Sequence, residues 1–183
     1  RAFYKCTSLK KVDNLNKVKS IGNMAFSTCP SLTSVGNLGN VTSLGEYAFT
    51  YCSSLTSVGD LSNVTDIGKR AFAGCISLQS IGNLPKVTTI GEWTFAGCAA
   101  LKSVGNMPNV TSLAHGAFAG YTLYDDDGQK IRTDYCTSLQ SIGNMPKLTT
   151  IGDSAFSRCS SLTSVGDLGN VTNIGSYAFG DCI

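Results

Sequence analysis

The chain has 183 residues, of which 14% are charged and 42% are hydrophobic, and its formal net charge is +2. So small a net charge gives no electrostatic basis for binding nucleic acid or an anionic membrane surface. No apolar run approaches the length of a membrane-spanning helix, so we expect no direct membrane insertion by this segment.

One repeating unit runs through the whole sequence. The eight cysteines and the eight phenylalanines each recur every 23 residues, except for one interval of 38, which is 23 plus an insertion of 15. A fixed short period is typical of a solenoid, in which each coil buries its apolar residues against its neighbours. We expect a single solenoid over residues 1–183. Because it opens with the end of one unit and stops just after another begins, we expect a fragment of a longer array.

Counted from each cysteine as position 1, the unit reads C-x-S-L-x-S-V/I-G-N/D-L/M-x-x-V-T-x-I/L-G-x-x-A-F-x-x. Two stretches of the unit, such as 31–36 and 40–45, have the same form, with β-branched and apolar residues closed by Gly. They predict two brief parallel strands per coil. The glycines at positions 8 and 17 are expected to turn corners with positive φ.

The third side of the unit has a different spacing. Ala48, Phe49, Cys52 and Leu55 fall on one face of a helix, so we expect a single helical or 3₁₀ turn that packs Phe and Cys inward. Stacking of the coils would then place equivalent side chains about 4.8 Å apart.

The unit at 75–97, CISLQSIGNLPKVTTIGEWTFAG, resembles a BspA-like leucine-rich repeat, whose 23-residue unit has the form C-x-S-L-x-x-I-x-I-P-x-x-V-T-x-I-G-x-x-A-F-x-x. The resemblance covers the chain apart from the insertion. It implies a right-handed leucine-rich-repeat solenoid, adhesion and protein-binding roles, and a cell-surface or secreted location.

The chain departs from that family pattern at position 9, where Asn or Asp stands in place of an inward Ile. We expect these side chains to form a hydrogen-bonded ladder at the turn, with ligand binding as the alternative. The residues at this position are Asn14, Asn37, Asp60, Asn83, Asn106, Asn144 and Asp167.

The cysteines are expected to be buried thiols, because each occupies an inward position. Disulfides between neighbouring coils are an alternative. Zinc is a weaker one, because the sequence has no C-x-x-C motif and its single histidine is His115. We expect no metal and no cofactor. No nucleophile with an orienting partner can be assembled, so we expect the chain not to be an enzyme.

The insertion at 121–135 is the only segment outside the repeat. Its Asp-Gly pair predicts a β-hairpin with its tip near Asp126–Gly128. A turn is favoured over a calcium site, because the run Asp125–Asp127 lacks the alternating spacing of a calcium loop. Loops on a regular scaffold often carry function. Tyr124, Asp126 and Asp127 are therefore candidate contact residues.

Position 19 is a highly variable column, and it holds aromatic and Arg residues of the kind enriched in binding hot spots. Its candidate binding residues are Tyr47, Arg70, Trp93 and Tyr177. The alternative is that these side chains merely cover the outside of the turn.

Together these features predict a non-enzymatic protein-binding or adhesion module. Its expected partner is a host or extracellular-matrix protein, or a glycan. The alternative is a structural spacer, or an accessory region of a larger multidomain protein or enzyme.

Overall fold

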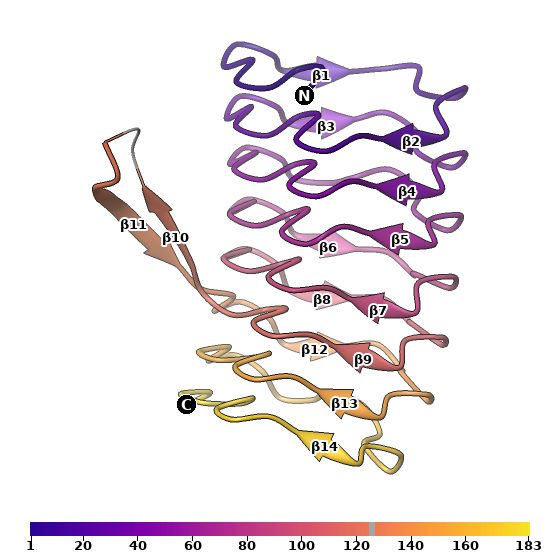
Figure 1. Cartoon of the computed structure of the whole chain (residues 1–183), viewed down its shortest axis with the longest axis vertical. Coiled ribbons are helices and arrows are strands. Elements are labelled where there is room, and N and C mark those ends of the chain that lie inside the picture. Colours follow the sequence, from indigo (N-terminus) through magenta and orange to yellow (C-terminus); the bar gives the residue numbers. More distant parts are fainter. Residues whose placement is uncertain (125–126) are drawn as a thin grey trace.

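The computed structural model describes residues 1–124 and 127–183, which form a stack of coils with a hairpin projecting from one side (Figure 1). We number the complete coils from the N-terminus, each beginning at a cysteine. Coils 1 to 7 comprise residues 6–28, 29–51, 52–74, 75–97, 98–120, 136–158 and 159–181.

Two columns of two-residue strands run along the stack, as predicted. The first column holds β1 (Lys11–Val12), β3 (Ser34–Val35), β6 (Ser80–Ile81), β8 (Ser103–Val104) and β12 (Ser141–Ile142). The second holds β2 (Ser20–Ile21), β4 (Ser43–Leu44), β5 (Asp66–Ile67), β7 (Thr89–Ile90), β9 (Ser112–Leu113), β13 (Thr150–Ile151) and β14 (Asn173–Ile174). Within each column the strands pair in parallel, residue on equivalent residue.

Both ladders are interrupted between coils 3 and 4. In the second column the pairing order is β2-β4-β5 and then β14-β13-β9-β7, with no ladder between β5 and β7 in the described chain. The first column is likewise discontinuous, because β6 pairs with β8 but not with Ser57 of coil 3. The backbone hydrogen bonds on the third side continue across this junction, for example from the Arg70 N–H to the Glu92 carbonyl at 2.9 Å.

The third side of the coil differs from the expected helical or 3₁₀ turn, because the described residues form no helix there. Left-handed residues at positions 19 and 23, such as Tyr47 (φ 57°) and Tyr51 (φ 59°), break the run of helical dihedral angles. The Phe49 N–H donates to the Ala71 carbonyl of the next coil at 2.7 Å. The N–H groups of this side therefore alternate: the Thr50 N–H donates within the turn to the Tyr47 carbonyl at 3.2 Å, whereas the Phe49 and Tyr51 N–H groups donate to the next coil.

The glycines of the two strand columns serve close packing and not the positive φ that we expected. Among those at positions 8 and 17, only Gly166 has a positive φ, of 75°. A Cβ on Gly45 would lie 2.5 Å from the Asn23 nitrogen, and one on Gly68 would lie 2.6 Å from the Gly45 carbonyl carbon. At Gly45 and Gly68 the backbone of the preceding coil passes too close for a side chain, whereas a Cβ on Gly22 or Gly82 would meet nothing within 4 Å.

The core is continuous along the stack, and two columns dominate it. Neighbouring phenylalanine rings stack almost parallel, with centroids from 5.0 Å apart at one end to 5.5 Å between Phe72 and Phe95. All eight cysteines are free thiols. Each from Cys29 onward donates to the carbonyl of a phenylalanine two units back along the chain, as Cys52 of coil 3 does to Phe26 of coil 1 at 3.0 Å. Buried thiols are thus found at the six inner cysteines, as expected, whereas Cys6 and Cys182 at the two ends are half-buried.

The position-9 side chains lie outside the core, and they form the expected ladder in part. The Asn106 N–H donates to Asn83 Oδ1 at 2.8 Å, and the Asn144 N–H to Asn106 Oδ1 at 3.0 Å. The following residue turns inward instead, as fully buried Leu38 and Met107 show. The inward apolar side chain is therefore at position 10 in this chain, one residue after the position of the inward Ile in the family pattern.

Candidate functional site

The insertion forms the predicted hairpin, with β10 (Tyr121–Tyr124) antiparallel to β11 (Lys130–Asp134). Gly128, at φ 76°, lies in the connecting turn. The hairpin leaves the stack after coil 5 and runs beside the third side of the earlier coils, toward the N-terminus (Figure 1). It therefore covers positions 19 and 23 of coils that precede it in the sequence.

Two glycines at position 23 make room, Gly97 for the hairpin and Gly74 for Tyr51, which holds the hairpin. A Cβ on Gly97 would lie 2.8 Å from the Cβ of Tyr121, and one on Gly74 would lie 2.7 Å from Cδ1 of Tyr51. Both glycines have positive φ, near 70°. In the earlier coils this position carries a side chain, such as Tyr51 itself. The coils thus carry no side chain at these two positions, and Tyr51 and Tyr121 occupy the space that a side chain would fill.

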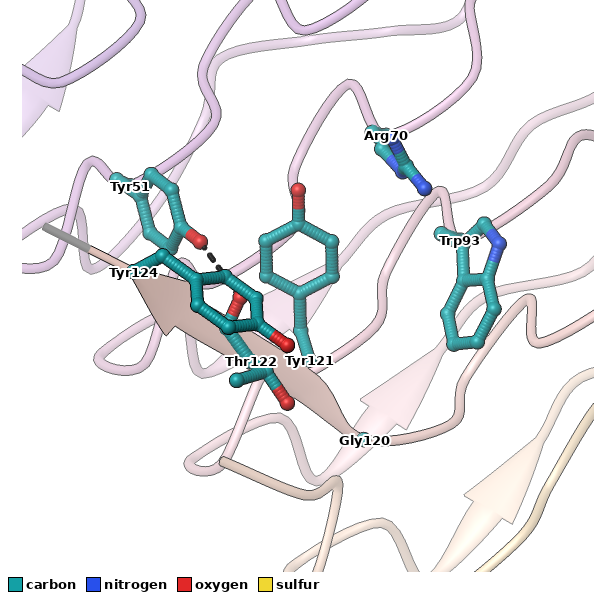
Figure 2. Close-up of a pocket in the computed structure, with 7 residues that line it drawn as sticks. All are labelled: Tyr51, Arg70, Trp93, Gly120, Tyr121, Thr122 and Tyr124. Carbon is teal, nitrogen blue, oxygen red and sulfur yellow. Dashed lines mark hydrogen bonds between the residues drawn. The ribbon is translucent and has the colours of Figure 1, made fainter. Parts of the chain in front are cut away.

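The hairpin is held to the coils at Tyr51. The Tyr51 hydroxyl donates to the Thr122 carbonyl at 2.9 Å, as Figure 2 shows. The Tyr51 and Tyr121 rings lie 5.4 Å apart at a tilt of 54°. Burial raises the pKa of both tyrosines, most strongly for Tyr51, whose pKa the nearby Tyr121 raises further. Both phenols therefore stay neutral near pH 7, where they can donate hydrogen bonds.

On the coil side of the site, the Trp93 ring packs against a glycine and a histidine of the next coil. A Cβ on Gly116, the position-19 residue of the next coil, would lie 2.7 Å from the Trp93 ring. The exposed His115 makes an edge contact with that ring, with centroids 4.8 Å apart. The indole is therefore fixed against a bare stretch of backbone and remains half-buried.

A cleft of about 530 Å³ lies between the hairpin and the coils. Its wall on one side comes from β10 and on the other from positions 19 and 23 of the coils (Figure 2). The lining residues are Tyr51, Arg70, Trp93, Gly120, Tyr121, Thr122 and Tyr124.

Arg70 supplies the charge of the cleft. Its Nη1 donates to the Tyr47 hydroxyl at 2.7 Å, and its guanidinium lies 5.6 Å from the Tyr47 ring and 5.8 Å from the Tyr121 ring. Its Nε is buried without a hydrogen-bond partner. In the described part of the chain, no carboxylate forms an ion pair with Arg70. The cation is oriented by aromatic groups and is not neutralised by a carboxylate of residues 1–124 or 127–183.

The structure brings together some of the predicted contact residues and separates others. Arg70, Trp93 and Tyr124 line the cleft, and Tyr47 lies beside it through its bond to Arg70. Tyr177, at 80% exposure, lies in coil 7 outside the cleft. Of the other two predictions, Asp127 is exposed in the turn of the hairpin, and Asp126 lies outside the described residues.

Sequence analysis missed Tyr51 and Tyr121, which anchor the hairpin. A signal for them exists in the position-23 column, where glycine occurs in the three coils just before the insertion, at Gly74, Gly97 and Gly120. A run of glycines beside an insertion indicates a surface onto which that insertion packs closely.

Residues 1–124 and 127–183 contain no group of three or more His, Cys, Asp or Glu side chains placed to hold a metal ion. No helix in these residues is long and apolar enough to cross a membrane.

Parallel two-residue strands stacked over a core of leucine, phenylalanine and cysteine define a leucine-rich-repeat solenoid, a repeat module for protein interaction. The chain belongs to the BspA type leucine rich repeat family, whose model matches residues 1–124 and 133–183 in six copies. The match leaves out most of β11, in agreement with the hairpin being an addition to the repeat.

Solved structures with this fold come from several bacteria. A leucine rich repeat protein of T. pallidum is 25% identical with a TM-score of 0.71, over 86% of this chain and 67% of its own. One from Eubacterium ventriosum is 25% identical with a TM-score of 0.78, over 96% and 44%. One from Bacteroides ovatus is 24% identical with a TM-score of 0.61, over 99% and 60%.

The chain therefore spans 44% and 60% of the lengths of the second and third of these proteins. The search of curated protein sequences gave no match.

Proposed function

We propose that the chain is an adhesion module of a cell-surface or secreted protein, and that it contacts an extracellular protein or glycan through the cleft beside the hairpin. The observation that carries the proposal is the position of the insertion. The one irregular segment of the chain packs against the coils that carry Tyr51, Arg70 and Trp93, and closes a cleft over them.

The composition of the cleft supports binding. Tyr, Trp and Arg are the residues most enriched in interface hot spots, because each combines a large contact area with a polar group. Tyr124 is 57% exposed on the hairpin, and half-buried Trp93 lies across the cleft from it. Glycines and ring contacts hold Tyr51, Tyr121 and Trp93 in place, so these side chains lose little entropy when a ligand binds.

The face of the stack that carries the position-14 threonines supports a spacer role better than a binding role. The threonine hydroxyls at position 14 donate to the preceding coil, as Thr65 Oγ1 does to the Thr42 carbonyl at 3.0 Å. These groups are used in holding the stack together. A spacer built of such coils, with a contact site at the hairpin alone, combines both roles.

Deletion of residues 121–135 tests the proposal. Joining Gly120 to Cys136 restores the 23-residue interval, so the coils keep their register. Native and deleted chains would be compared by biolayer interferometry against purified extracellular-matrix proteins and immobilised glycans, after circular dichroism has shown that both are folded. We expect the deletion to abolish binding, and Tyr177→Ala, in the same column but outside the cleft, to leave it unchanged.

Equal binding by the native and deleted chains would remove the hairpin from the function. Absence of binding by the native chain across the whole panel would favour the spacer.

A further inference from the structure

We propose that the cleft binds an acidic glycan, with the pyranose ring of a carboxylated sugar between Trp93 and Tyr124 and its carboxylate on Arg70. This inference rests on the proposed function, because it names the ligand class of the same cleft. Carboxylated pyranoses occur as sialic acids and as hexuronic acids, and the two share the chemistry argued below.

The charge of the cleft favours a ligand that supplies an anion. Arg70 is half-buried among aromatic rings, and no described carboxylate neutralises it. A guanidinium presents its donors in one plane, which matches the two oxygens of a carboxylate. Nη1 is fixed by the Tyr47 hydroxyl at 2.7 Å, so the plane of the guanidinium is set before a ligand arrives. Such preorganisation lowers the entropy cost of binding.

The walls of the cleft suit a sugar ring. One face of a pyranose presents C–H bonds, which carry a small positive charge and are attracted to the negative face of an aromatic ring. Trp93 is held on the coil side by Gly116 and His115, and Tyr124 comes from β10 on the other side. The rim of a pyranose is lined with hydroxyls, and the cleft provides tyrosine hydroxyls and Thr122 to meet them.

A peptide is less well matched. Hot spots of protein interfaces lie in well-packed, fully desolvated pockets. This cleft is an open space lined by hydroxyl-bearing aromatic side chains, and the leucines and phenylalanines of the core are closed off from it. Its volume of about 530 Å³ falls in the range of small-ligand sites.

Two matched pairs of saccharides test the ligand class. One pair is 3′-sialyllactose and lactose; the other is a trimer of galacturonic acid and its methyl ester. Binding would be followed by the fluorescence of Trp93, the single tryptophan of the chain, and by calorimetry. We expect at least one carboxylated member to bind about tenfold or more tightly than its neutral partner, as a charge-assisted hydrogen bond implies. Which pair responds identifies the source of the carboxylate.

Variants at Arg70 and Trp93 test the assigned contacts. Arg70→Gln is expected to remove the preference for the carboxylated sugar while leaving weak binding of the neutral one. Arg70→Lys should restore only part of the preference, because an ammonium group lacks the planar pair of donors. Trp93→Ala should weaken the binding of both the acidic and the neutral sugar. Its binding would be measured by calorimetry, because the variant lacks the fluorophore. Tyr177→Ala is the matched control, and we expect it to bind like the native chain.

Equal affinity for the acidic and neutral members of both pairs, or no binding of any of the four, would overturn the inference. Binding of an acidic, tyrosine-containing peptide in place of the sugars would also overturn it, in favour of a protein ligand. These outcomes are separable from failure of the proposed function. That function survives if the deletion of 121–135 still abolishes binding to a matrix protein.

Discussion

A phenylalanine in the middle of the stack is covered on both faces by its counterparts in the neighbouring coils. The ring centroid of Phe95 lies 5.5 Å from that of Phe72 and 5.3 Å from that of Phe118, and none of the Phe95 surface is exposed. Phe3, at the N-terminal end of the described stack, contacts the ring of Phe26 alone and is 38% exposed. The same residue at the same position therefore contributes differently according to its place in the stack.

We expect Phe95→Ala to lower the free energy of unfolding by about 3–5 kcal/mol, the usual result of truncating a buried aromatic residue. Phe3→Ala should cost much less, because it leaves no enclosed cavity. Chemical denaturation of both variants measures the difference, and equal costs would contradict nearest-neighbour stacking.

The corner glycines allow a second comparison within one column. Gly68→Ala places a methyl group against the backbone of coil 2, whereas a Cβ on Gly22 meets nothing within 4 Å. Overpacking of this kind typically costs about 1–3 kcal/mol. We expect Gly68→Ala to lower the midpoint of denaturation and Gly22→Ala to leave it nearly unchanged. A similar loss for both would show that conformational freedom, and not close packing, selects glycine here.

The strands differ in how they are held, although their sequences are alike. The Gly68 N–H donates to the Leu44 carbonyl at 2.8 Å, but the equivalent Gly91 N–H has no partner in the described chain, because β5 and β7 do not pair. The junction of coils 3 and 4 is joined mainly by the third side and the core.

Amide hydrogen exchange tests this interruption. Because exchange requires a free N–H, the Gly91 amide should exchange faster than that of Gly68, which occupies the same position with its bond intact. Exchange followed by NMR on the native chain gives both rates in one experiment. Equal protection would mean that the ladder is continuous across this junction in solution.

Sequence patterns predicted some elements well and others poorly. Most strands of the coils followed from short β-branched stretches closed by Gly, and the hairpin followed from its Asp-Gly turn, because these signals are local. The third side did not follow. The spacing of Ala48, Phe49 and Cys52 fits a helix, but positive φ at Tyr47 and Tyr51 directs the backbone to the next coil instead.

The column of thiols couples the stability of the whole stack to pH. Burial raises the pKa of Cys52 and Cys136 to about 12, and raises those of Cys75 and Cys98 well above their ordinary value. Above about pH 9 the unfolded chain loses thiol protons that the folded chain retains, so stability is fully present below that pH and falls as pH rises.

We expect the free energy of unfolding to fall between pH 9 and pH 10, by up to about 1.4 kcal/mol per pH unit for each fully buried thiol. Chemical denaturation at a series of pH values gives the slope. Cys98→Ala is the control, because it removes a single buried thiol and should reduce the slope by that amount. An unchanged slope in this variant would show that the thiols are not responsible.

By itself the sequence determined the repeat, the strands, the inward columns and the presence of a hairpin, because each depends on short-range spacing that every coil repeats. The tertiary structure decided which way the hairpin folds and which residues it meets. Tyr51 and Thr122 are 71 residues apart, and their hydrogen bond exists only because three intervening coils bring them to one side of the stack. No local pattern encodes a contact of that range, so the cleft became visible only once the coils were in register.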